Sequence, residues 1–258
     1  MELTTNRRKD VTIVVPVYNE CKTILTLLHE LQSFVKSCKF NCEVVIVESG
    51  SSDGTTEIIE DFVQMGESKT KFRVYFEPKP KGKGSACKIG ISQSLGKTIV
   101  IFDADLEYSL NDLEILVSSM IGKSEKIILG SRHKKHQPMR VFEQSKLRSL
   151  YFNQGHRFLT SYFNILFSTK LRDPATMWKV VDGDLARRIK FKSNRFDFDW
   201  ELLGSFIRLG HKPREINIHY NSRSPNEGKK IRPVRDPLHW LFRIFVFRYR
   251  KVQFHENY

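Results

Sequence analysis

The sequence predicts an α/β protein in which a mostly parallel central sheet is flanked by helices on both faces. Short apolar runs rich in β-branched residues alternate, through the first hundred residues, with segments whose apolar residues repeat at helical spacing. This alternation occurs four times in succession. Consecutive β-α units form parallel sheets, because each helix carries the chain back to the start of the next strand.

The expected strands of this first half are the apolar runs 11–17, 43–47, 72–76 and 98–102. The first strand precedes a helix with apolar residues at positions 24, 27, 28, 31 and 35, and the second precedes a helix that begins after Asp53. The third strand is followed by the lysine- and glycine-rich loop 79–84 and then by a helix expected over 85–95. Another helical pattern begins at Leu110.

The second half is less regular, and no internal repeat or linker is visible in it. It predicts a strand over 127–130, a long aromatic-rich helix over 146–167, a helix over 199–209 and an alternating strand over 215–220. We therefore expect an N-terminal extension (1–10), one domain (11–235) and an amphipathic C-terminal tail (236–258).

Composition narrows the class of protein. The chain has 258 residues and 40% hydrophobic content, enough for one sizeable core. We see no secretory signal and no apolar run near the roughly 18–20 residues that a membrane-spanning helix needs. We therefore expect a cytoplasmic protein with reduced cysteines. The net charge of +14 favours anionic partners. With no nucleic-acid recognition motif, it favours phosphate-bearing ligands or a membrane surface over nucleic acid.

Two carboxylates, Asp103 and Asp105, directly follow the buried run 98–102. On an extended segment, residues two apart point to the same side. Paired carboxylates suit a hard divalent cation that keeps open positions for phosphate oxygens. The alternative is a helix cap, because a helical pattern begins at Leu110.

Other polar segments are expected at the same edge of the sheet. Ligands of parallel sheets bind at the carboxyl ends of the strands. Asn19 and Glu20 follow the first strand, and the turn-rich segment 48–54 follows the second. Both would lie beside the segment 103–105.

Four motifs, in this order and spacing, resemble family 2 glycosyltransferases of the GT-A fold. They are VVPVYNE at 14–20, ESGSSDGT at 48–55, KGKGSA at 81–86 and FDAD at 102–105. Further motifs resemble the branch that includes dolichyl-phosphate mannose synthases and bacterial polyprenyl-phosphate sugar transferases: GSR at 130–132, Arg148, FDWELL at 198–203 and a basic segment at 223–230. The segments 173–180, 194–199 and 222–237 look closest to bacterial members of surface-polysaccharide pathways. The resemblance covers roughly residues 10–250.

The resemblance implies a nucleotide-sugar as co-substrate and Mg²⁺ or Mn²⁺ as cofactor. It implies that Asp103 and Asp105 bind the cation, with Asp105 more strongly implied as a direct ligand. Glu107 is either a third residue that faces the metal or a surface acid of the loop. The residues implied to bind the nucleotide-sugar are Pro16, Tyr18, Glu20, Glu48, Lys83 and Asp103. Glu48 and Ser49 replace an Asp-Asp pair common in the family.

Arg132 and Arg148 match arginines that contact the pyrophosphate and the acceptor phosphate. Guanidinium groups suit this role because their planar fork matches phosphate oxygens. Glu201 and Asp199 occupy an acidic motif that faces the sugar and the acceptor. One of these acids would act as general base on a hydroxyl acceptor, whereas a lipid phosphate needs no base.

The leading hypothesis is a metal-dependent, inverting transfer of a sugar from a nucleotide-sugar to a polyprenyl phosphate. Transfer to a glycan hydroxyl in surface-polysaccharide assembly is the runner-up. A non-catalytic nucleotide- or membrane-binding protein on the same fold is the third reading.

The C-terminal tail is predicted to form an amphipathic helix. Asp236-Pro237 is typical of a helix start. Positions 238, 241, 242, 245 and 249 then form an apolar stripe, interrupted by arginines. Such a helix suits the interface of an anionic membrane, which would place the protein peripherally on the cytoplasmic membrane face. The alternatives are packing on the domain or contact within a homodimer.

Overall fold

The computed structural model describes residues 9–65, 71–133, 146–221 and 235–256, without the side chains of 65 and 146–148. Most of the expected N-terminal extension (1–10) and all of the basic segment at 223–230 therefore lie outside the described residues. The described part contains a seven-stranded sheet with the order β3-β2-β1-β4-β6-β5-β7. Its strands are β1 (Lys9–Val17), β2 (Cys42–Glu48), β3 (Phe72–Phe76), β4 (Gly96–Ile101), β5 (Ile127–Ser131), β6 (Lys179–Asp182) and β7 (Arg214–Asn217).

The sheet is mostly parallel, as the sequence predicts. β1 pairs in parallel with β2 and β4, β2 with β3, and β5 with β7. Only β6 runs the other way among these strands, antiparallel to both β4 and β5. The sequence does not predict β6, because this strand has four residues and begins with a lysine. The predicted strand over 215–220 is shorter than expected: β7 ends at Asn217, and Tyr220 forms an isolated bridge with Tyr108.

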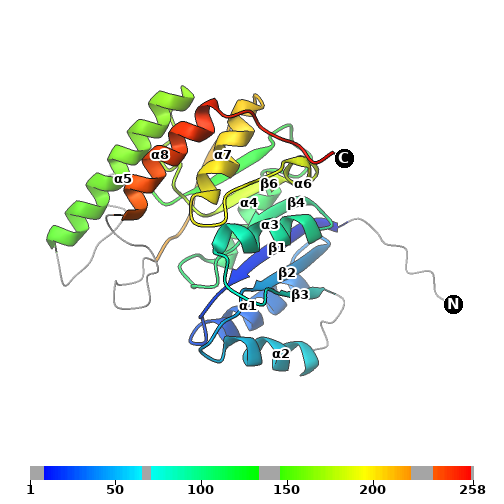
Figure 1. Cartoon of the computed structure of the whole chain (residues 1–258). Coiled ribbons are helices and arrows are strands. Elements are labelled where there is room, and N and C mark those ends of the chain that lie inside the picture. The colour runs from blue at the N-terminus through cyan, green and yellow to red at the C-terminus, as the bar shows by residue number, and fades with distance from the viewer. Residues whose placement is uncertain (1–8, 66–70, 134–145, 222–234, 257–258) are drawn as a thin grey trace.

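Helices cover both faces of the sheet (Figure 1). They are α1 (Ile24–Ser37), α2 (Thr55–Met65), α3 (Lys83–Gln93), α4 (Leu110–Ser118), α5 (Lys146–Phe167), α6 (Gly183–Arg188), α7 (Phe198–Arg208) and α8 (Arg235–Tyr249). The helix predicted at 85–95 begins two residues earlier, and the helix predicted at 199–209 begins one residue earlier.

Two large apolar clusters lie on opposite faces of the sheet. Successive residues of β1 contribute to different clusters. Val11, Ile13 and Val15 pack with residues of α1, α2 and α4, whereas Val14 packs with residues of α3, α5, α6, α7 and α8. Burial on both faces explains why the parallel strands are almost continuously apolar. It also leaves the ends of the strands as the place where polar groups gather.

α5, α7 and α8 lie together at one side of the domain (Figure 1). α8 buries Ile244 and Phe247 against this group, so the helix predicted for the tail packs on the domain. Four of the five residues of the predicted apolar stripe are exposed nevertheless: Leu238, Phe242, Phe245 and Tyr249. Among the described residues, no helix is both long and apolar enough to cross a bilayer.

Candidate active site

The segments that follow β1, β2 and β4 meet at one edge of the sheet, as predicted. The backbone N–H of Asn19 donates to the Ser51 hydroxyl (2.9 Å), and that of Glu20 donates to the Thr55 hydroxyl (2.9 Å). The Thr23 hydroxyl donates to the carbonyl of Ala104 (2.8 Å), between the two predicted metal ligands. The strand-end segments therefore form one connected rim. Pro16 lies in β1 opposite Val47, and Tyr18 is 37% exposed on this rim.

The carboxylate pair does not lie on an extended segment, because β4 ends at Ile101 and the chain turns. Leu106 adopts a left-handed backbone conformation (φ 57°), unusual for a residue with a branched side chain. Asp105 Oδ1 accepts the backbone N–H of Glu107 (3.1 Å). The Glu107 carboxylate accepts the Tyr220 hydroxyl (2.8 Å). The expectation that the two carboxylates lie on an extended segment is thus wrong: a turn, not a strand, places them.

Asp103 is joined to a buried lysine. Lys83 Nζ lies 2.5 Å from Asp103 Oδ1, and the side chains are 10% and 17% exposed. Burial alone would lower the pKa of Lys83, but the carboxylates of Asp103 and Asp199 raise it above its usual value. Lys83 is therefore a fixed positive charge next to the predicted metal ligands. A divalent cation fits the carboxylates of Asp105 and Glu107, which are hard oxygen donors, whereas Asp103 already has a counter-charge.

The glycines around Lys83 are required by packing. Gly82 has φ +106°, and a Cβ there would lie 2.5 Å from the Asn194 carbonyl oxygen. A Cβ on Gly84 would lie 2.7 Å from the Ser193 carbonyl oxygen. Larger residues would push this loop off the segment that precedes α7. The absence of a Cβ at positions 82 and 84 thus allows the loop to pack closely enough to bury Lys83 beside Asp103.

Asp199 lies in the same buried cluster as Lys83. The Asp199 side chain is 5% exposed, and its Oδ1 lies 3.9 Å from the Nζ of the fully buried Lys179. Neither carboxylate oxygen of Asp199 has a hydrogen-bond partner among the described residues. Burial raises the pKa of Asp199, although Lys83 and Lys179 oppose that shift. Burial also lowers the pKa of Lys179 to about 8. A carboxylate without hydrogen bonds in this setting is poised for a ligand or a proton.

The carboxylate of Glu201, by contrast, accepts hydrogen bonds from the backbone. Its oxygens accept the backbone N–H groups of Lys192 (3.0 and 3.2 Å) and Ser193 (2.7 Å). It therefore stabilises the segment against which the Lys83 loop packs. Of the two acids predicted in this motif, Asp199 is the one whose oxygens are not taken up by backbone donors.

Glu48 also folds back onto its own loop. Its carboxylate accepts the backbone N–H groups of Gly50 (3.0 Å) and Ser51 (2.7 Å). The neighbouring Ser49 donates to Glu77 (2.8 Å), and so does Ser85 (2.7 Å). Glu77, which the sequence does not single out, thus joins the loop after β2 to the start of α3.

Arg132 is held by a partner that sequence reasoning missed. Its Nε and Nη2 donate to the two carboxylate oxygens of Asp173 (2.8 Å each), and its backbone N–H donates to Oδ2 (3.0 Å). Although burial opposes ionisation, Arg132 holds the pKa of Asp173 well below its usual range. His156 Nε2 lies 3.0 Å from Asp173 Oδ1. Arg148 lies near the start of α5, but its side chain is outside the described residues.

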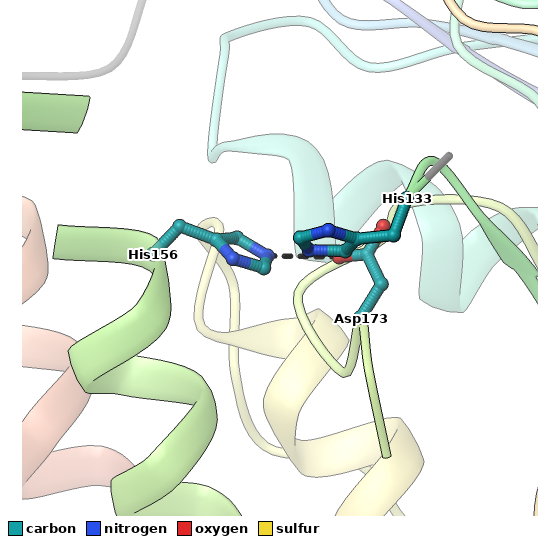
Figure 2. Close-up of side chains that lie close together, drawn as sticks. All are labelled: His133, His156 and Asp173. Carbon is teal, nitrogen blue, oxygen red and sulfur yellow. Dashed lines mark hydrogen bonds and ion pairs between the residues drawn. The ribbon is translucent and has the colours of Figure 1, made fainter. Parts of the chain in front are cut away.

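His133, His156 and Asp173 converge from three segments (Figure 2). Their potential ligand atoms lie within 4.8 Å of one another. Four donors already point at the two oxygens of Asp173, three from Arg132 and one from His156. A cation bound here would have to replace the proton shared by His156 and Asp173. It would also lie next to the positive charge of Arg132, which would repel it. The donor set at 105–107 fits a divalent cation better.

Comparisons with known proteins agree with this architecture. The family model "Glycosyl transferase family 2" matches residues 12–182. The chain therefore belongs to glycosyltransferase family 2 and is a glycosyltransferase. It is 31% identical over 245 residues to a human dolichyl-phosphate beta-glucosyltransferase (87% of this chain, 70% of the relative). It is 26% identical over 251 residues to the Dictyostelium discoideum protein of the same name (93% and 74%).

Solved structures show the fold. Glucosyl-3-phosphoglycerate synthase from Mycobacterium tuberculosis, solved with Mn²⁺, UDP and glucosyl-3-phosphoglycerate, matches with a TM-score of 0.65 at 15% identity. The match covers 93% of this chain and 80% of that chain. Mannosyl-3-phosphoglycerate synthase from Rubrobacter xylanophilus matches with the same TM-score at 16% identity, covering 93% and 72%. The fold is thus the GT-A fold predicted from the sequence.

Proposed function

We propose that this protein transfers a hexosyl unit from a nucleotide-sugar to a polyprenyl phosphate, with inversion at the anomeric carbon. The proposal rests mainly on one observation. The loop 103–107 and Arg132 both contact Tyr220, which is bridged to Tyr108. The Tyr220 hydroxyl donates to the Glu107 carboxylate. The Arg132 guanidinium lies over the Tyr220 ring, with Cζ of Arg132 5.2 Å from the ring centroid. Carboxylates for a cation and an arginine for phosphate thus share one rim. The named activity of the curated relatives supports a polyprenyl-type acceptor.

In this mechanism each described residue has a defined task. Asp105 and Glu107 would hold Mg²⁺ or Mn²⁺, and the cation would supply positive charge to stabilise the diphosphate leaving group. Tyr18 and Glu20 would line the nucleotide pocket, and Lys83 would supply positive charge beneath it. Arg132 would orient phosphate oxygens, with Arg148 as its proposed partner. An acceptor phosphate oxygen attacks the anomeric carbon, and the nucleoside diphosphate leaves with the electron pair of the broken C–O bond.

A glycan hydroxyl is the second candidate acceptor, and Asp199 is the observation in its favour. A hydroxyl nucleophile must lose a proton as it attacks. Asp199 is a buried carboxylate with a raised pKa and no hydrogen-bond partner in the described part of the chain. Those properties suit a general base, so we propose Asp199 rather than Glu201 for that role.

The exposed faces of α5 and α8 support an anionic membrane surface as partner. On α5, Tyr151, Phe158 and Ile165 recur every seven residues and are 55%, 61% and 78% exposed. α8 lies beside α5 and exposes its own apolar stripe (Figure 1). Arg157, Lys170 and Lys251 are exposed on or next to these helices. Exposed aromatics beside basic residues match an anionic lipid interface, where a polyprenyl phosphate would be located. We propose docking at the cytoplasmic membrane face.

The test is a direct assay of donor and acceptor. Purified protein would first be screened by thermal shift against nucleotide-sugars with Mg²⁺ or Mn²⁺. The donor that stabilises it would then be offered with a short-chain polyprenyl phosphate and, separately, with oligosaccharides as hydroxyl acceptors. We expect transfer to the lipid phosphate with an inverted anomeric configuration by NMR. Transfer only to hydroxyls would support the second candidate, and donor binding without transfer would contradict both.

A further inference from the structure

His156 is buried on α5 and joins the candidate site through Asp173. His156 is 8% exposed, and Asp173 is fully buried. The imidazole Nε2 and the Asp173 Oδ1 are 3.0 Å apart. Asp173 in turn accepts both Nε and Nη2 of Arg132 at 2.8 Å. The imidazole thus contacts the carboxylate that holds the guanidinium.

The backbone at Asp173 is itself anchored by hydrogen bonds to a side chain of β7. Glu215 of β7 accepts the backbone N–H groups of Arg172 (2.9 and 3.0 Å) and Asp173 (2.8 Å). The backbone at Asp173 is therefore fixed. The rotation of its carboxylate is set by the donors on its two oxygens: three belong to Arg132, and the fourth is His156 of α5.

The orientation of Arg132 matters because the guanidinium has donors to spare. The Arg132 side chain is 4% exposed. Of its five N–H groups, the Nε–H and one Nη2–H go to Asp173, and the other three have no partner among the described residues. The guanidinium lies over the Tyr220 ring, whose hydroxyl donates to Glu107. Continuous contacts therefore run from α5 through Arg132 to the loop that carries the predicted metal ligands.

We infer that His156 is a positioning residue for Arg132. It donates its Nε2–H to Asp173, which fixes the direction in which the guanidinium presents its remaining donors to acceptor phosphate oxygens. The inference rests on the proposed function, in which Arg132 orients phosphate oxygens, and it goes further by taking these to be the oxygens of the acceptor phosphate. A planar guanidinium gains most from bidentate geometry, so a tilted Arg132 would lose acceptor affinity while its charge remained.

The experiment compares His156→Ala, His156→Gln and the matched control Gln154→Ala, an exposed position on the same helix. We expect His156→Ala to raise the KM for a short-chain polyprenyl phosphate by about tenfold or more, with the donor KM nearly unchanged. His156→Gln should restore most of the loss, because its amide N–H reaches as far as imidazole Nε2. Gln154→Ala should match wild type.

A second measurement needs no turnover. In ¹⁵N-arginine NMR, the Nε–H signal of Arg132, assigned through Arg132→Lys, should be protected from exchange in wild type and His156→Gln. It should exchange faster in His156→Ala. An unchanged signal, or an equal rise in both KM values with no rescue by Gln, would overturn the inference. Stoichiometric Zn²⁺ in the purified protein, lost in His156→Ala, would overturn it in favour of a metal-ligand role. Failure of wild type to use any lipid phosphate would instead overturn the proposed function, and the NMR result would still decide the role of His156.

Discussion

Lys83 Nζ lies 2.5 Å from Asp103 Oδ1, so the glycine-flanked loop before α3 is tied to the loop after β4. The two residues are 20 positions apart in the sequence and come from adjacent β-α units. The ion pair neutralises the first carboxylate of the pair inside the protein. We therefore expect the second, Asp105, to be the principal protein ligand of the cation.

The first prediction follows from that division of roles. Asp105→Asn should keep the fold, because the residue lies in a turn at the strand end, and should abolish metal-assisted binding of nucleotide-sugar. Calorimetric titration of the donor with and without Mn²⁺ measures this. Glu107→Gln is the matched comparison, because its amide oxygen can still accept the Tyr220 hydroxyl. Undiminished affinity and full metal dependence in Asp105→Asn would exclude it as a ligand.

The second prediction concerns stability. Lys83→Met should destabilise the protein by about 3 kcal/mol, because it leaves Asp103 partly buried without its counter-charge. The double variant Lys83→Met/Asp103→Asn should recover much of that loss, since no unpaired charge remains. Urea denaturation of the two single variants, the double variant and wild type gives the coupling energy. Additive effects would show that the ion pair does not contribute in solution.

Much of this arrangement could be predicted from sequence, because it rests on local patterns. The apolar runs at 11–17, 43–47, 72–76 and 98–102 predict the parallel half of the sheet, and parallel topology brings their carboxyl ends to one edge. The contact between Thr23 and the Ala104 carbonyl confirms that convergence. The helix over 146–167 is also as predicted, because its apolar residues repeat regularly.

What the sequence could not show depends on pairs that are far apart along the chain. Arg132 and Asp173 are 41 residues apart, and no periodic pattern relates them. Glu77 and His156 carry no motif of their own, and only the fold places their partners beside them. Glu48 and Glu201 were predicted as ligand-facing acids, yet each accepts backbone N–H groups. A sequence shows that an acid is present but not which donors reach it.

The third prediction separates the two acids of α7. Glu201→Gln should lower the free energy of unfolding by about 1–3 kcal/mol, because a neutral amide oxygen accepts the backbone N–H groups of Lys192 and Ser193 more weakly than the carboxylate does. Asp199→Asn should change stability less and reduce transfer far more, because its oxygens hold no backbone group. Thermal unfolding and initial rates of transfer would be measured on both variants. Full transfer activity in Asp199→Asn would remove Asp199 from the site.

The fourth prediction concerns pH. Burial lowers the pKa of Lys179 from 10.5 to about 8 in the folded protein. Between those pH values the unfolded chain binds a proton that the folded protein does not, so stability rises with pH. Lys179→Met removes this group. The free energy of unfolding of wild type should therefore increase, relative to Lys179→Met, between about pH 8 and about pH 10.5. Parallel pH profiles would show that Lys179 does not titrate in this window.

The last prediction is that the exposed stripe of α8 docks on an anionic membrane. Phe242 and Phe245 are 63% and 48% exposed, so replacing both with serine should leave the thermal unfolding temperature nearly unchanged. Co-sedimentation with vesicles of anionic lipid should fall, because the aromatic area that enters the headgroup region is lost.

Ile115→Ser is the control for this test, because Ile115 is 54% exposed on α4, away from α5 and α8. Raising NaCl from about 0.1 M to about 0.5 M should weaken wild-type binding, since basic residues near the surface contribute about 1 kcal/mol each before screening. Two of the arginines that interrupt the stripe are engaged within the protein: Arg243 pairs with Asp197 (2.8 Å), and Arg248 donates to the Leu166 carbonyl (2.6 Å). The salt effect should therefore come from residues such as Lys251, and Lys251→Gln should reduce it. Vesicle binding that is absent at every salt concentration, together with a concentration-dependent dimer that Phe242→Ser/Phe245→Ser abolishes, would assign the stripe to a homodimer contact instead.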